Sequence, residues 1–221
     1  MFLFLVQAIN VSMAQSTYQF GALPSLNLNK KLENAWSLNG KIESRQLIQS
    51  GQFKGEIFNK NKYVLTDFSL ITAKKIRLNS RFAGGYLLRL EDGDVFHRFI
   101  QQYIVVQKFS GFRFAHRLSC DQTFSKIEAA EYRLRYRITT EIPLNGESVD
   151  PGEFYLKINN EYVNSIQSKE YDLEIRLVPL VGYDITDNFK VETGIDYRIN
   201  SFITNSARNS YWMNLNFFVD L

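Results

Sequence analysis

The sequence has one cysteine, two histidines and no long apolar run in its main body, and each scarcity excludes a class of protein. Because Cys120 is the only cysteine, the chain can form neither an internal disulfide nor a metal site with several thiolates. Beyond the first residues, no stretch reaches the roughly 18 consecutive apolar residues that a membrane helix requires, which excludes a helical inner-membrane protein. The 26 basic and 23 acidic residues are interspersed, so a nucleic-acid partner is not expected.

Residues 1–14 predict a cleaved export signal. Residues 2–9 are mostly apolar, and Ser12-Met13-Ala14 fits the small-residue pattern of a cleavage site, which would leave Gln15 first. The basic residues that usually precede the apolar run are missing, so an upstream translation start is the alternative to an atypical signal.

From there on, apolar and polar residues alternate with a period of two, which is typical of strands with one apolar and one polar face. Residues 132–138 are the clearest example, with three arginines between apolar residues. Turn sequences such as Asp92-Gly93 and Pro151-Gly152 separate the segments. The expected strands are 17–29, 35–46, 62–73, 80–91, 96–108, 112–124, 130–142, 153–163, 171–183, 188–200 and 209–220.

The number of these segments is odd, whereas bacterial single-chain barrels usually have even strand numbers. A hidden strand at residues 52–58 would make twelve, which we slightly favour. Alternatively, the first segment, which contains Pro24, lies outside the wall and leaves ten.

Strand length and aromatic placement favour a membrane barrel over a secreted or periplasmic β-sandwich. Many segments exceed the soluble norm of about 5–6 residues, and tyrosine and phenylalanine recur near segment ends, as in aromatic girdles. We therefore predict an all-β fold, a single antiparallel transmembrane β-barrel of about 10–12 strands over residues 15–221. The chain ends like the C-terminal assembly signal of outer-membrane barrels, although with leucine in place of the usual aromatic residue; its apolar positions are Tyr211, Met213, Leu215, Phe217, Val219 and Leu221.

In such a barrel the polar faces of the strands line the lumen, which receives charges of both signs. A barrel of this size is narrow, so long side chains of opposite sign are expected to pair and fill it. The alternative is a constricted pore or ligand site in which an arginine row attracts anions. The predicted network consists of Glu43, Arg45, Arg117, Arg133, Arg135, Arg137, Glu141, Glu161, Arg176, Glu192 and Arg198.

No catalytic or metal motif is found, and we expect no catalytic residue, metal or cofactor. A lipid-modifying enzyme would need His97 or His116 beside a serine or carboxylate, but His116 and Ser119 point to opposite faces of one strand. No Gly-x-Ser-x-Gly or His-Glu-x-x-His sequence occurs.

Several short motifs resemble a family of Bacteroidetes-type outer-membrane barrels that is defined only as a domain of unknown function. They are Phe96-His97-Arg98-Phe99-Ile100-Gln101-Gln102-Tyr103, His116-Arg117-Leu118, Tyr132-Arg133-Leu134-Arg135-Tyr136-Arg137, Ile142-Pro143-Leu144, Asn160-Glu161, Gly182-Tyr183 and Tyr197-Arg198. The sequence departs from the family at Ser119 and Asp121, where arginine and glutamate are expected. The resemblance implies a barrel in the outer membrane and no particular chemistry.

The sequence thus favours a non-enzymatic outer-membrane barrel of a Gram-negative cell, acting as an accessory or structural subunit of an envelope assembly with a charged, largely filled lumen. A narrow channel for small, anionic solutes and a lipid-modifying barrel enzyme are the alternatives. The expected partners are outer-membrane lipid, the barrel-assembly machinery during insertion, and a larger outer-membrane protein complex.

Overall fold

A computed structural model describes residues 16–201, 203 and 206–221, and each regular element among them is a β-strand. The predicted export signal at residues 1–14 lies outside this part of the chain. The strands are β1 (Thr17–Lys31), β2 (Trp36–Gln52), β3 (Ile57–Arg77), β4 (Ser80–Glu91), β5 (Asp94–Phe109), β6 (Phe112–Phe124), β7 (Glu131–Pro143), β8 (Phe154–Gln167), β9 (Glu170–Thr186), β10 (Phe189–Asn200) and β11 (Arg208–Asp220). Within the described residues, no helix is long and apolar enough to cross a membrane.

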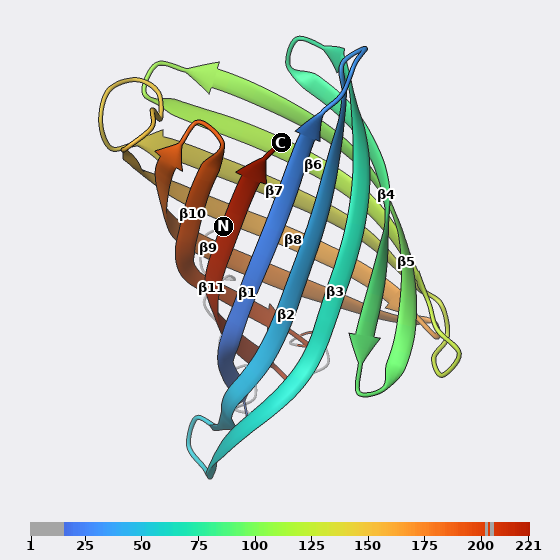
Figure 1. Cartoon of the computed structure of the whole chain (residues 1–221). Helices are drawn as coiled ribbons and strands as arrows, with labels where there is room; N and C mark the ends of the chain where they lie inside the picture. Colours follow the sequence, from blue (N-terminus) through green and yellow to red (C-terminus); the bar gives the residue numbers. More distant parts are fainter. Residues whose placement is uncertain (1–15, 202, 204–205) are drawn as a thin grey trace, which may run out of the picture.

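The eleven strands form one closed barrel, in which each strand pairs with its neighbours in sequence and β1 pairs with β11 (Figure 1). The all-β barrel prediction is confirmed, but the preference for twelve strands is wrong. Residues 53–56 only connect β2 to β3, and the β2–β3 hairpin extends past its neighbours at one end of the barrel (Figure 1).

The closing pair is parallel, with Ala22 opposite Met213 and Leu26 opposite Phe217. This follows from the odd strand number, because strands that alternate in direction return to the starting direction at the eleventh. The barrel is therefore antiparallel except at this one pair, which corrects the expectation of an entirely antiparallel sheet. The first segment is a wall strand in spite of Pro24, which has no partner in the register between β1 and β2.

The odd count also places the two ends of the described chain at opposite ends of the barrel. We call the end at which β1 begins the N-terminal end, and the end at which β11 finishes the C-terminal end (Figure 1). The turn between β4 and β5 at the N-terminal end is tight, because Asp92 and Gly93 both have positive φ, as a two-residue type I′ turn requires.

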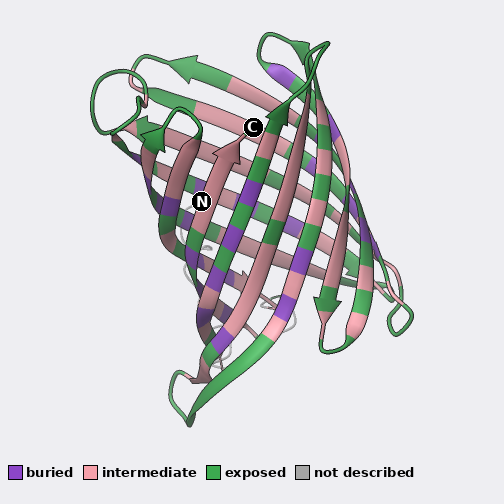
Figure 2. Cartoon of the chain, viewed as in Figure 1, coloured by how far each residue is buried: buried purple, intermediate pink, exposed green. Residues whose placement is uncertain are grey.

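Side chains are distributed inside out compared with a water-soluble protein. On β7 and β9, Leu134 and Leu177 face outward and are 48% and 44% exposed. Charged residues on the inward faces are buried, and Glu161 on β8 is only 1% exposed. Figure 2 shows this alternation of exposed and buried positions along the wall strands. The packed interior of the barrel is therefore largely polar.

A small apolar cluster inside the barrel, formed by Leu23, Leu47 and Trp212, lies toward the N-terminal end. The Trp212 ring occupies the space beside Gly21, where an added Cβ would approach ring carbon Cζ3 to 2.6 Å. Leu47 faces inward like the lumen-lining Arg45 two residues before it, and the register between β2 and β3 shifts around residues 45–49.

Candidate functional site: the charged lumen

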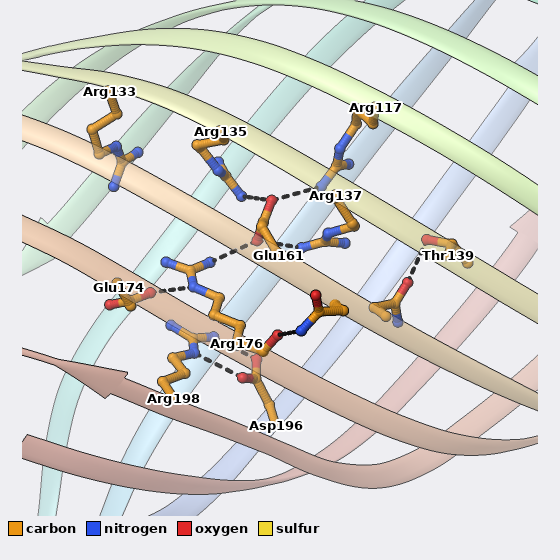
Figure 3. Close-up of polar contacts among 12 residues, drawn as sticks. Arg117, Arg133, Arg135, Arg137, Thr139, Glu161, Glu174, Arg176, Asp196 and Arg198 are labelled. Carbon is orange, nitrogen blue, oxygen red and sulfur yellow. Dashed lines mark hydrogen bonds and ion pairs between the residues drawn. The ribbon is translucent and has the colours of Figure 1, made fainter. Parts of the chain in front are cut away.

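Glu161 is the centre of the lumen network, and four arginines surround its carboxylate (Figure 3). Arg135 and Arg137 each donate to it at 2.9 Å, and Arg117 and Arg176 each lie at 3.4 Å. The strand register explains this arrangement, because Arg117, Arg137, Glu161 and Arg176 are direct neighbours across β6 to β9. A single buried carboxylate thus neutralises part of the charge of four guanidinium groups.

A second buried carboxylate, Asp121, extends this network along β7. One oxygen of Asp121 accepts hydrogen bonds from Arg133 at 2.9 Å and Arg135 at 3.0 Å. Because Arg135 contacts both Asp121 and Glu161, it links the two carboxylates. Glu131 lies 3.7 Å from Nε of Arg133.

Further ion pairs line the rest of the lumen; most join residues of one strand or of adjacent strands, and the Lys157–Glu192 pair joins β8 to β10 past β9. Arg198 holds Asp196 through two hydrogen bonds, and Arg176 also donates to Glu174 (Figure 3). Other pairs are Lys41 with Glu43 at 2.5 Å, Arg45 with Glu43 at 3.5 Å, Arg89 with Asp67 at 2.8 Å, and Lys157 with Glu192 at 2.7 Å.

The predicted network residues do not form one cluster. Arg117, Arg133, Arg135, Arg137, Glu161 and Arg176 meet in the centre of the lumen, and Arg198 follows Arg176 on the next strand. Glu43 with Arg45, and Glu192 with Lys157, form separate pairs on other parts of the wall. Glu141 pairs with Arg113 at 2.5 Å, toward the C-terminal end.

Several members of the network were not predicted from the sequence, and Arg98 stands out among them. Arg98 is 6% exposed, and Nε donates to Thr123 at 2.8 Å. No carboxylate of the described residues lies within ion-pair distance of it. The one signal in the sequence is that Arg98 lies two residues before Ile100 and therefore shares its face of β5. That face is inward although Ile100 is apolar, and the outward face carries the polar Gln101, so polarity alone does not identify the inward face of β5.

Between these groups the lumen contains a cavity of about 470 Å³. Arg89 and Arg98 line it and also line a second cavity of about 170 Å³ near the N-terminal end. A third cavity of about 250 Å³ lies toward the C-terminal end, beside Glu141 and Tyr155, so the lumen is not filled along its whole length.

Both histidines lie on the outer face, and each contacts a tyrosine. Nδ1 of His97 is 2.5 Å from the Tyr86 hydroxyl, and Nδ1 of His116 is 2.9 Å from the Tyr136 hydroxyl. Ser119 is 2% exposed and belongs to the inward face. In the described chain, no group of three or more His, Cys, Asp or Glu residues is placed to hold a metal ion.

The predicted assembly-signal residues lie on or directly after the closing strand. Tyr211, Met213, Leu215, Phe217 and Val219 belong to β11, opposite alternate residues of β1. Leu221 follows the strand, and its backbone N–H donates to the Asn29 carbonyl at 2.7 Å. The last residue thereby continues the pairing with β1.

Comparison with known proteins identifies a family for nearly the whole barrel. The model of a family described as "Protein of unknown function (DUF2490)" matches residues 20–211. This confirms the predicted resemblance to a family of unknown function, whereas its Bacteroidetes and outer-membrane character stays a prediction. No curated protein and no solved structure matches the chain.

Proposed function

The chain belongs to the DUF2490 family, whose function is unknown, and we propose that it is a non-enzymatic β-barrel of the outer membrane that serves as an accessory or structural subunit of an envelope assembly. The observation that carries this proposal is the inside-out distribution of side chains around a closed barrel. Closure leaves no unpaired strand edge, which is the condition for a sheet to reside in lipid.

The outer wall has the composition that a hydrocarbon environment selects. Leu134, Leu177 and Leu215 are each more than 40% exposed, and they belong to a continuous series of outward apolar residues on neighbouring strands. In water, an apolar surface of this extent would favour aggregation. Aromatic contacts such as Phe109 with Phe112, and Phe154 with Tyr183, lie at strand ends, where membrane barrels have aromatic girdles.

The accessory role rests on the lumen. Ion pairs line it from strand to strand, and a barrel of eleven strands is well below porin size. Most turns are also short, which leaves little surface for large ligands beyond the wall. Docking to a larger membrane protein through the wall or the turns fits this shape best.

Export and assembly form part of the same proposal. The signal-like residues 1–14 would direct the chain out of the cytoplasm. The apolar alternation of β11 would be recognised by the barrel-assembly machinery during insertion, and outer-membrane lipid would then cover the wall.

Affinity purification from outer membranes tests the accessory role. A tagged chain would be extracted in mild detergent beside an equally expressed, tagged barrel of unrelated sequence. The proposal predicts a partner at fixed stoichiometry that is absent from the control. Purification of a lone barrel, in several detergents and after mild cross-linking, would contradict the accessory role.

A narrow anion channel is the second candidate, favoured by the arginine-rich lining of the 470 Å³ cavity. Planar bilayer recordings separate the two functions. The structural role predicts no conductance above background. Anion-selective currents that weaken in Arg98→Gln, but not in the surface variant Arg77→Gln, would favour the channel.

A further inference from the structure

The larger lumen cavity contains more positive than negative charge. Its lining includes eleven basic residues, nine arginines and two lysines, and five acidic ones. Four more carboxylates outside this lining pair with its arginines, namely Glu91, Asp121, Glu131 and Glu161, and they bring the acidic total to nine. The excess is two positive charges within one narrow compartment, where water screens charge less than at a surface.

The arginines of this compartment also have unused hydrogen-bond donors. The Nε atoms of five of them have no hydrogen-bond partner among the described residues, but they have almost no accessible surface and do not face the cavity: Arg45, Arg117, Arg133, Arg135 and Arg137. Arg98 is more exceptional, because Thr123 is its only hydrogen-bond partner in the described chain and no carboxylate pairs with it. A buried guanidinium normally has an anionic partner.

The internal carboxylates cannot supply the missing partners. Glu161 is already shared by four arginines, and Asp121 by two. Water could accept hydrogen bonds from the Arg98 guanidinium, which lines the cavity, but it cannot neutralise the charge. An anion with several acceptor oxygens would do both, and the planar fork of a guanidinium matches an oxyanion in particular.

The surroundings of the cavity favour a pocket over a passage. The Leu23–Leu47–Trp212 cluster lies toward the N-terminal end. Beyond Arg89 and Arg98, the second cavity is lined by Glu91, Glu128 and Glu131, whose charges oppose an anion. In the other direction, the larger cavity extends to Asn27, Asn39 and Asn216, which lie on strands near the C-terminal end and carry no charge.

We propose that this cavity binds a small multivalent oxyanion of the phosphate class, held by Arg98 and its lumen neighbours Arg89 and Arg133, and reached from the C-terminal end. The site goes beyond the structural role proposed above and does not depend on a membrane location. The cavity volume lies within the usual range for small-ligand sites, so a phosphorylated small molecule fits as well as the free ion.

Calorimetric titration of the purified full-length barrel with inorganic phosphate and with pyrophosphate, at constant ionic strength, tests the proposal. We expect saturable binding, tighter for the more highly charged pyrophosphate. Arg98→Gln and Arg133→Gln each remove one donor group and should raise Kd about tenfold to hundredfold. Arg77→Gln removes an equal charge from the end of β3, outside the cavity, and should change Kd by less than about twofold.

A variant that is expected to strengthen binding shows that a change in Kd does not come from loss of folded protein. Asp67→Asn frees Arg89 from one carboxylate that lines the cavity and should lower Kd. Heat-modifiable migration of each variant on a gel verifies that the barrel is folded. Absence of saturable binding to either anion by the folded wild type would overturn the proposal. An equal weakening by Arg98→Gln and Arg77→Gln would do so too, because it would indicate general charge attraction.

Discussion

Replacing Glu161 by glutamine should strongly destabilise the barrel. The substitution preserves side-chain volume but removes the charge that four arginines share at 2.9 to 3.4 Å. The new amide NH₂ would also face guanidinium donors. Since Glu161 is 1% exposed, water cannot replace the lost interactions. Loss of one partner from a buried ion-pair network costs about 3–5 kcal/mol, and we expect a loss in this range.

Urea unfolding in detergent micelles measures this effect, with Trp212 in the lumen as the fluorescent reporter. Glu170→Gln is the matched control, because Glu170 is exposed at the start of β9 and should change the free energy of unfolding by no more than about 0.5 kcal/mol. A Glu161→Gln protein as stable as this control would refute the view that the lumen network holds the barrel together.

Three further predictions concern the wall and its closure. Leu177→Arg on the outer face should cost about 2–4 kcal/mol in lipid if the residue lies near the bilayer midplane, whereas urea unfolding should detect almost no change if this face contacts water. Gly182→Ala should destabilise the barrel by about 1–3 kcal/mol, because the added Cβ would approach the Tyr155 ring to 2.1 Å; thermal unfolding checks this against wild type. Cysteines at Ala22 and Met213, in a protein lacking its native cysteine, should form a disulfide on oxidation, and failure to cross-link would argue against parallel closure.

The period-two pattern predicted the strands because each wall residue faces one of two contrasting environments. All eleven expected segments form strands, and β2 and β3 extend furthest beyond the expected ends, into a hairpin in which residues 57–63 of β3 are exposed on both faces. The sequence shows eleven alternating segments, which is the correct strand number. The general preference of barrels for even strand numbers is the reason that twelve strands were wrongly favoured. The parallel closure then follows from the count alone.

Alternation assigns faces less well where a strand has apolar residues on both. On β9, Val178 and Leu180 are buried inside while Leu177 is exposed outside, so residue type does not distinguish the two faces. On β5, Gln101 lies outside and bonds reciprocally to Gln122 at 3.1 and 3.0 Å, whereas Arg98 lies inside. This mixture is the reason that Arg98 was missed.

The partners within the lumen could not be read from the sequence, because they depend on the register between strands. Glu161 meets four arginines only because it lies opposite Arg137 on one side and Arg176 on the other. A shift of two residues would preserve every inward face and give a different set of ion pairs.

The membrane location is the central claim, and fractionation combined with heat-modifiable migration tests it most directly. Membranes from cells that express the full chain would be separated by density, and the extracted protein would be run on a gel with and without boiling. The proposal predicts recovery with the outer membrane and faster migration of the unboiled, folded barrel. A chain that is soluble and monodisperse without detergent, with identical migration before and after boiling, would contradict the proposal.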